Sequence, residues 1–378
     1  MKIAVLTLPL TVNYGGFLQC YALCKTLRAM GHDVQHINIQ TTYRLPVYKM
    51  PYIYTKRIIQ KLRGKKCLLF AEQHANKVNG IIQQHMARFI EDHIPSTSPF
   101  YNPKALEALN KESYDAFIVG SDQVWRPTNY LPTEVYFLSF LKNTSTRRIA
   151  YAASFGTDDI EYTKNDQKRC GQLIKLFSAI SIREKSASNL IKNKYHWQCK
   201  EPEFVLDPTL LLTADDYKKL SQTVDAASNQ GNLFYYVLDM TADKHRTLEK
   251  IAQAKGLKPF TVFPKSTLPT DKTEDRIVPS LEKWLRGFQN AEYVFTDSFH
   301  GTVFAILFNK PFIVYGNNGR GMARFHSLLQ LLKLENRLIL NSKDLSPLLE
   351  YKIDWQTIDN IINEYKLKSI RFIKDNLK

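Results

Sequence analysis

The first forty residues alternate between short apolar runs and an amphipathic segment, which restricts the fold. Residues 2–8 form a short apolar run, residues 17–30 carry apolar side chains at helical spacing, and residues 33–39 form a second apolar run. A strand, a turn, a helix and another strand in this order are typical of a βαβ unit, whose two strands lie parallel in one sheet. The chain therefore begins like an α/β protein.

The same alternation continues along the chain and restarts after Asp207-Pro208. The predicted strands of the first part are 116–120, 147–155 and 179–184, and an apolar run at 204–212 ends this part. The predicted strands of the second part are 233–239, 260–263, 293–297 and 312–315, and its predicted helices are 245–256, about 280–290 and a segment from about 302. We predict two Rossmann-like domains that face a cleft, because parallel sheets bind ligands beyond the carboxyl ends of their strands.

The predicted boundaries follow from this restart. The first domain covers 1–210, the second covers 211–350, and 351–378 form a C-terminal segment. Within that segment, residues 355–376 are predicted to form a long helix that packs back toward the first domain.

The formal net charge of +16 favours anionic partners such as phosphorylated metabolites, acidic glycans or an anionic bilayer. No nucleic-acid-binding motif is present, so nucleic acid is not an expected partner. The five cysteines include no CxxC pair, which suits a reducing compartment. The apolar start of the chain ends at Pro9 without a cleavage site, and no apolar run reaches the roughly 18 residues of a membrane span. We expect a cytoplasmic protein.

Residues 44–66 differ in composition from their surroundings. They contain eight Lys or Arg and no acidic residue, interleaved with Tyr, Ile and Leu. One interpretation is a basic insertion that is merely solvated. The other is an amphipathic segment that touches anionic lipid at the inner face of a membrane.

Polar residues and glycines follow the predicted strands of the first domain, where a cleft would form. A turn with two glycines leads into the first helix, whose free N–H groups suit an anion, although a tight turn alone would explain it. Asp122 could face the cleft or cap a helix. The candidate substrate-binding residues are Asn13, Tyr14, Gly15, Gly16, Gln19, Ser121, Asp122, Gln123 and Ser154.

Arg183 and His300 are the candidate catalytic residues. Arg183 leaves the end of a buried strand, where a guanidinium group could bind carboxylate or phosphate, or could pair with a scaffold Asp. His300 lies at a strand-to-helix turn, and histidine, with its ordinary pKa near 6.5, can act as a general acid at neutral pH. Arg320 and Arg324, at a later turn, form a plausible second anion site.

Seven strings, in this order, resemble the polysaccharide pyruvyl transferase family over about residues 1–340. They are NYGGFLQCYAL, VGSDQVW, YAASFG, SIREKS, VLDPTLLL, TDSFHGTVFAILFNKPFIVY and RFHSLLQLLKLENR. The resemblance implies a GT-B-like fold, phosphoenolpyruvate as donor and a glycan or lipid-linked sugar as acceptor, with a pyruvate ketal as product. It also implies that Arg183 and His300 match the family's arginine and histidine, and that no cofactor or metal is needed.

The sequence departs from the family at one point. Ser298-Phe299-His300 stands where several characterised relatives carry Arg-Leu-His. Ser298 is therefore added to the candidate substrate-binding residues. Two explanations stay open: Arg320 or Arg324 replaces the missing arginine, or the donor is a different molecule. Two other functions stay open: a GT-B glycosyltransferase with a nucleotide-sugar donor, and a non-catalytic protein that binds glycans or a membrane surface.

Overall fold

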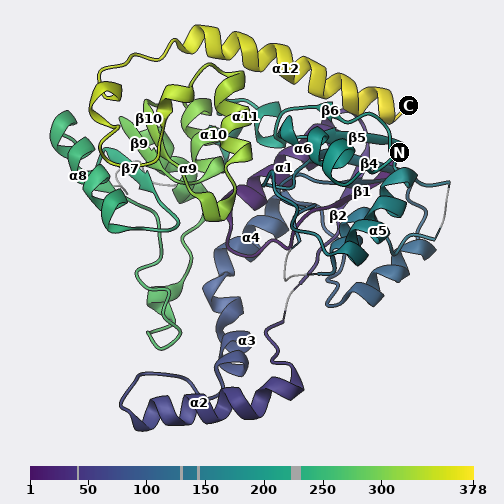
Figure 1. The fold of residues 1–378 in the computed structure, drawn as a ribbon, viewed down its shortest axis with the longest axis horizontal. Coiled ribbons are helices and arrows are strands. Elements are labelled where there is room, and N and C mark those ends of the chain that lie inside the picture. The colour runs from purple at the N-terminus through teal and green to yellow at the C-terminus, as the bar shows by residue number, and fades with distance from the viewer. Residues whose placement is uncertain (41, 128–130, 143–144, 223–230) are drawn as a thin grey trace.

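The computed structural model describes residues 1–40, 42–127, 131–142, 145–222 and 231–378, and these contain two separate parallel sheets (Figure 1). The six-stranded sheet has the order β2 (Asp33–His36), β1 (Lys2–Leu6), β3 (Ala116–Val119), β4 (Arg147–Ala153), β5 (Ala179–Ile182) and β6 (Glu203–Phe204). The five-stranded sheet has the order β11 (Leu338–Ile339), β10 (Phe312–Tyr315), β9 (Tyr293–Thr296), β7 (Leu233–Tyr236) and β8 (Pro259–Phe260). All neighbouring strands are parallel.

Two parallel sheets with helices between their strands confirm the predicted fold class. The sheets belong to different parts of the chain, which we call the first half (the six-stranded sheet) and the second half (the five-stranded sheet). Their strands are short, and the inner strands, such as β3, β5, β9 and β10, are completely buried, as expected for parallel sheets with both faces covered. The domain boundaries at 210 and 350 stay predictions.

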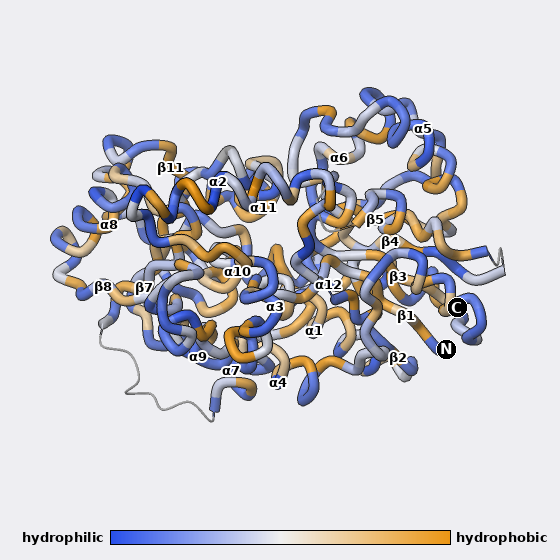
Figure 2. The backbone as a smooth tube through the Cα atoms, turned by 90° about the horizontal axis from the view of Figure 1, so that it is seen from below, coloured by the Kyte–Doolittle hydropathy of each residue, from blue (hydrophilic) through white to orange (hydrophobic). Residues whose placement is uncertain are grey.

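The helices are α1 (Tyr14–Ala29), α5 (Lys164–Leu173) and α6 (Ser186–Asn189) in the first half, and α7 (Ala214–Leu220), α8 (Ala242–Lys255), α9 (Leu281–Asn290), α10 (Phe299–Leu307) and α11 (Ala323–Leu331) after it. Of these, α1, α8, α9 and α10 lie close to helices predicted from the sequence, whereas α5 and α7 were not predicted. α8 begins earlier than predicted, at Ala242, and so do the two helices that follow strand-end turns, α1 at Tyr14 and α10 at Phe299. In both, an extended Asn or Ser precedes the first turn, so the helix starts right after the strand-end turn. Figure 2 shows hydrophobic residues along the inner strands and hydrophilic ones on outer helices such as α5 and α8.

The start of α1 lies against the second half. Tyr14 stacks on Trp284 with 5.4 Å between ring centroids, and its hydroxyl donates a hydrogen bond to the carbonyl of Pro279. Lys185 N–H donates to Ser327 Oγ, which ties the end of β5 to α11. These contacts bring the carboxyl ends of both sheets toward each other.

The C-terminal helix α12 (Trp355–Asn376) packs back on the first half, which confirms that part of the predicted fold (Figure 1). Ser369 Oγ accepts a hydrogen bond from the backbone N–H of Leu206 at 3.0 Å. Phe372 lies beside Tyr151, with 6.3 Å between ring centroids. The chain thus crosses between the two halves for a second time, now from the second half back to the first.

The basic segment and the residues after it form a helical projection. Its helices are α2 (Met50–Leu62) and α3 (Ala71–Ile82). The next helix, α4 (Gln84–His93), lies next to the two halves, and α2 is farthest from them (Figure 1). Throughout the described residues, no helix is both long and apolar enough to cross a bilayer.

Candidate active site

A cavity of about 670 Å³ lies between the two halves at the carboxyl ends of their strands. Residues of both halves line it, from the turn after β1 and the turn after β3 to the start of α10 and the start of α11. Its basic lining residues, within the described part of the chain, are Arg126, Arg276, Arg320, Arg324 and His300. Of its lining residues only Asp122 and Asp297 are acidic, so the wall can attract an anion.

His300 lies in the first turn of α10 and is only 4% exposed. Its ring packs directly over the backbone of Gly15, since a Cβ atom added to Gly15 would lie 2.0 Å from His300 Nδ1. His300 Nε2 is 3.6 Å from Asp207 Oδ2, too far for a hydrogen bond, and has no hydrogen-bond partner among the described residues. His300 lines the cavity, while its Nε2 is buried and lies within ion-pair distance of Asp207.

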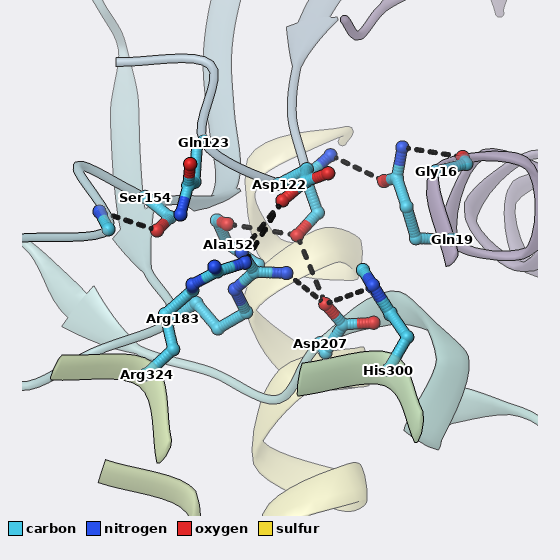
Figure 3. A network of polar contacts seen from close by, with 12 residues as sticks. Gly16, Gln19, Asp122, Gln123, Ala152, Ser154, Arg183, Asp207, His300 and Arg324 are labelled. Atoms are coloured by element: carbon cyan, nitrogen blue, oxygen red, sulfur yellow. Dashed lines mark hydrogen bonds and ion pairs between the residues drawn. The ribbon is translucent and has the colours of Figure 1, made fainter. Parts of the chain in front are cut away.

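Asp207 is the carboxylate that joins the two candidate catalytic residues (Figure 3). Its Oδ2 accepts a 2.5 Å hydrogen bond from Arg183, and its Oδ1 accepts hydrogen bonds from the hydroxyl and N–H of Thr209. Burial disfavours the charged form of Asp207, but Arg183 and His300 outweigh it and hold the pKa of the carboxyl well below its usual value. An anionic Asp207 stabilises a positive charge on the His300 ring.

Arg183 is buried behind the cavity and does not line it. Its two terminal nitrogens donate to Asp207 and, at 3.2 Å, to Asp122, and its guanidinium lies 4.6 Å from the ring centroid of Phe299. Burial opposes its charge, but Asp207 and Asp122 raise the pKa of Arg183. Pairing with scaffold carboxylates, one of the two interpretations of this arginine, is what the contacts show, and a catalytic role stays a prediction.

Arg324 reaches the cavity from the start of α11. It is buried, lies 5.4 Å from the ring centroid of Phe299, and forms a 3.4 Å contact with Asp122 Oδ1. Burial, and then the nearby charge of Arg183, lower the pKa of Arg324 to about 10. Its Nε has no hydrogen-bond partner among the described residues, so this arginine is incompletely neutralised.

Asp122 and Arg320 complete the charged wall. Burial raises the pKa of Asp122, but Arg183, His300 and Arg324 outweigh it and keep this carboxyl below its usual pKa. Arg320 donates two hydrogen bonds to Asp239, at 2.6 and 3.0 Å.

The other candidate residues divide into two sets. Asn13, Tyr14, Gln123 and Ser298 line the cavity together with Asp122, Arg320, Arg324 and His300. Gly15, Gly16, Gln19, Ser121 and Ser154 do not line it.

The second set holds the turns in place (Figure 3). Gln19 accepts a hydrogen bond from the N–H of Ser121 and donates to Thr7 Oγ1 and the carbonyl of Gly16. Ser154 Oγ accepts from the N–H of Gly156. These residues support the wall of the cavity without forming it.

Sequence reasoning missed four charged groups, namely Asp207 and the cavity-lining Arg126, Arg276 and Asp297. Asp207 preceded a proline and was interpreted only as a domain boundary, whereas Arg126 and Arg276 lie in segments without a regular apolar pattern. An acid after an apolar run, at a strand end, was the available signal for Asp207. No comparable signal marked Arg126 and Arg276, because tertiary structure, and not a local sequence pattern, places these loop residues at the cavity.

Ser298, at the departure from the family pattern, caps α10. Its side chain accepts a hydrogen bond from the N–H of Gly301 at 3.3 Å. We expect Ser298→Ala to lower the free energy of unfolding by about 1 kcal/mol, the usual cost of a lost N-cap. Denaturant titration measures the change. Ser98→Ala, at an exposed position in a loop, is the control, and equal stability of both variants would contradict the capping role.

Comparison with protein families identifies this arrangement. A family model described as polysaccharide pyruvyl transferase matches residues 13–319. The chain belongs to the polysaccharide pyruvyl transferase family. The match includes Asn13, Arg183, Asp207 and His300, and it confirms the family resemblance; six of the seven strings lie within it, and the string that begins at Arg324 lies beyond it. The protein is thus a member of a transferase family whose name implies a sugar-containing acceptor. No curated protein matches the sequence significantly.

Solved structures share the fold. UDP-N-acetylglucosamine 2-epimerase from Rickettsia bellii has a TM-score of 0.51 at 10% identity, and the alignment covers 100% of this chain and 97% of the epimerase. A glycosyltransferase from Rickettsia africae has a TM-score of 0.49 at 12% identity, covering 100% of this chain and 94% of that one. At such low identity, the likeness to the epimerase shows the GT-B-like fold of this family member and nothing about its substrate.

Proposed function

We propose that this family member transfers the pyruvyl group of phosphoenolpyruvate to two hydroxyl groups of a sugar, forming a pyruvate ketal. The observation that carries the proposal is the position of His300, at the wall of an arginine-lined cavity and with Nε2 3.6 Å from the carboxylate of Asp207. A proton donor beside several cations matches the needs of a substrate that carries a carboxylate and a phosphate and must be protonated on carbon.

The cavity offers cations for both anionic groups of the donor. Arg324 has an Nε without a hydrogen-bond partner among the described residues, and Arg276 lines the same space. Arg126 and Arg320 also line it, and each would exchange its carboxylate partner, Glu161 or Asp239, for the donor. Guanidinium groups bind carboxylates and phosphates through two parallel hydrogen bonds. Arg320 and Arg324 share the cavity with Ser298, which supports the interpretation that one of them replaces the arginine found in relatives.

The reaction needs no redox step and no cofactor. Protonation of the methylene carbon by His300 converts it to a methyl group and leaves C2 electron-poor. One sugar hydroxyl adds to C2, the C–O bond to phosphate breaks, and the second hydroxyl adds to C2. One hydroxyl proton restores the imidazolium and the other leaves with phosphate. Asp207, held anionic by Arg183, stabilises the imidazolium before the transfer.

A second cavity of about 620 Å³ adjoins the first and suits the acceptor. Thr11 and Val12 line both cavities. The other described lining residues are neutral, namely Gln40, Thr42, Tyr43, Gln83, Tyr101, Asn102, Pro103, Leu131 and Pro132. Amide and hydroxyl groups beside aromatic rings can hydrogen-bond and stack on a sugar, so we assign the glycan acceptor to this side.

The function is tested with the purified protein, phosphoenolpyruvate and a panel of free and lipid-linked glycans. Phosphate release that depends on the glycan, together with a product heavier by one pyruvate ketal, supports the proposal. Turnover of nucleotide-sugars instead would replace it with a glycosyltransferase function. No turnover of either donor class, with glycan binding retained, would favour a non-catalytic role. All five cysteines are free, which fits a cytoplasmic reaction.

We expect Arg324→Lys to raise the KM for phosphoenolpyruvate roughly tenfold, because an ammonium group cannot reproduce the planar two-point contact. The KM for the acceptor should change less. Steady-state phosphate release at varied donor concentration measures both. Arg246→Lys, in exposed α8, is the control with the same chemical change. An unchanged donor KM in Arg324→Lys would exclude this arginine from donor binding.

A further inference from the structure

The projection formed by α2 and α3 holds one amphipathic helix away from both sheets (Figure 1). Its base is closed by Asn76, whose side chain exchanges two hydrogen bonds with the backbone of Tyr43, at 2.9 and 3.0 Å. None of the residues of α2 is buried. An amphipathic helix without a buried residue has an exposed surface that a binding partner can cover.

The orientation of α2 is fixed by contacts at its junction with α3. Arg57 donates to both carboxylate oxygens of Glu72, at 2.8 and 2.6 Å, and to the carbonyl of Leu69. Tyr54 packs edge-on against Phe70, with 5.7 Å between ring centroids. The face of α2 that carries Tyr54 and Arg57 is therefore turned toward α3.

The opposite face of α2 is apolar and exposed. Tyr52, Ile59 and Leu62 follow each other at spacings of seven and three residues, so they share one side of the helix. Their exposed fractions are 70%, 43% and 82%. Tyr48, in the turn before α2, extends this face and is 79% exposed.

The flanks of this face are cationic. Lys56 and Arg63 are exposed, and residues 44–66 contain eight Lys or Arg and no acidic residue. A second copy of this surface would bring like charges together, which opposes self-association through α2. An anionic bilayer instead complements both the charge and the apolar residues, and tyrosines favour the interface between headgroups and acyl chains.

We propose that α2 lies in the headgroup region of an anionic membrane and holds the two halves at a short distance from it. Tyr43 and Gln83, at the two ends of the projection, also line the neutral cavity assigned to the acceptor. A lipid-linked glycan held in the same membrane would thus have a short path to this cavity. The membrane contact stands independently of the ketal-forming reaction.

The proposal is tested with the full chain and two sets of vesicles, one of phosphatidylcholine alone and one containing about 30% phosphatidylglycerol. We expect co-sedimentation with the anionic vesicles only, weakening as salt rises. The variant Lys56→Gln/Lys61→Gln/Arg63→Gln should bind at least about tenfold more weakly. The variant Tyr52→Ser/Ile59→Ser/Leu62→Ser should also bind more weakly, because the apolar face then cannot enter the headgroup region.

The matched control is Lys164→Gln/Lys168→Gln/Lys175→Gln, which removes three charges from α5 and the turn after it. This variant should bind like the wild type. An equal loss of binding in the control would assign binding to the net charge of +16 rather than to α2. Unchanged binding in both the glutamine and the serine variant of the α2 region would overturn the proposal. A wild-type dimer that the serine variant converts to a monomer would also overturn it. Turnover on free glycans is measured separately, so a failed vesicle experiment leaves the proposed function unaffected.

Discussion

His300→Ala should lower kcat by roughly 10²–10⁴ while changing the KM of phosphoenolpyruvate less, because in the proposed reaction this histidine donates a proton to carbon in the transition state. In this variant, Arg324 and the other arginines of the cavity would still bind the anionic groups of the donor. The measurement is phosphate release at saturating donor and acceptor, alongside the melting temperature of the same preparation.

The control for this variant is His245→Ala, at an exposed histidine on α8. It should keep full turnover. A folded His300→Ala protein with wild-type turnover would exclude His300 as the acid. A purely structural histidine predicts the reverse pattern, a lowered melting temperature with unchanged specific activity of the folded fraction.

Gly15→Ala should lower kcat by about 10²-fold, although Gly15 does not line the cavity. The added Cβ would lie 2.0 Å from His300 Nδ1 and 2.6 Å from its Cβ, so the imidazole must leave its position. Alanine is favoured over glycine inside a helix by about 1 kcal/mol, so α1 itself should not weaken. Turnover and thermal unfolding of the same variant separate these effects.

Gly16→Ala is the matched control for this prediction. An added Cβ at Gly16 has its nearest neighbour, Asn13 Nδ2, at 3.6 Å, which is an ordinary contact. Its turnover should stay close to that of the wild type. The double variant Gly15→Ala/His300→Ala should be no slower than His300→Ala alone, because Gly15 acts through the histidine. Additive losses would show a separate role for Gly15.

Most of the fold was predictable because its strands are short apolar runs separated by regular helices. The strand predicted at 312–315 and the helix predicted at 355–376 match β10 and α12 to the residue. The starts of α1 and α10 were predicted late, since Gly15, Gly16 and Gly301 suggested turns although they lie inside helices. The projection of α2 and α3 was not predicted, because no local pattern says where a helix lies relative to the rest of the chain.

The site was predictable only where a single residue carried the signal. A histidine at a strand end, or an arginine at a turn before a helix, can be recognised locally, which is why His300 and Arg324 were candidates. The role of Gly15 depends on a ring 285 positions away in the sequence, and that of Asp207 on two partners from different sheets. Such roles follow from tertiary contacts alone. For Arg183 the sequence left two interpretations, and its contacts show the one that the sequence could not single out, a buried partner of two carboxylates.

Asp122 has a consequence for how the two halves could move. It accepts contacts from Arg183 of the first half and from Arg324 of the second, so one carboxylate bridges the two. A ligand anion that engages Arg324 competes with Asp122 for the same guanidinium. Donor occupancy and hinge opening between the halves would then be thermodynamically linked, each altering the equilibrium of the other. In the proposed reaction, the Arg324 guanidinium that binds the donor would also make one of the contacts that hold the two halves together.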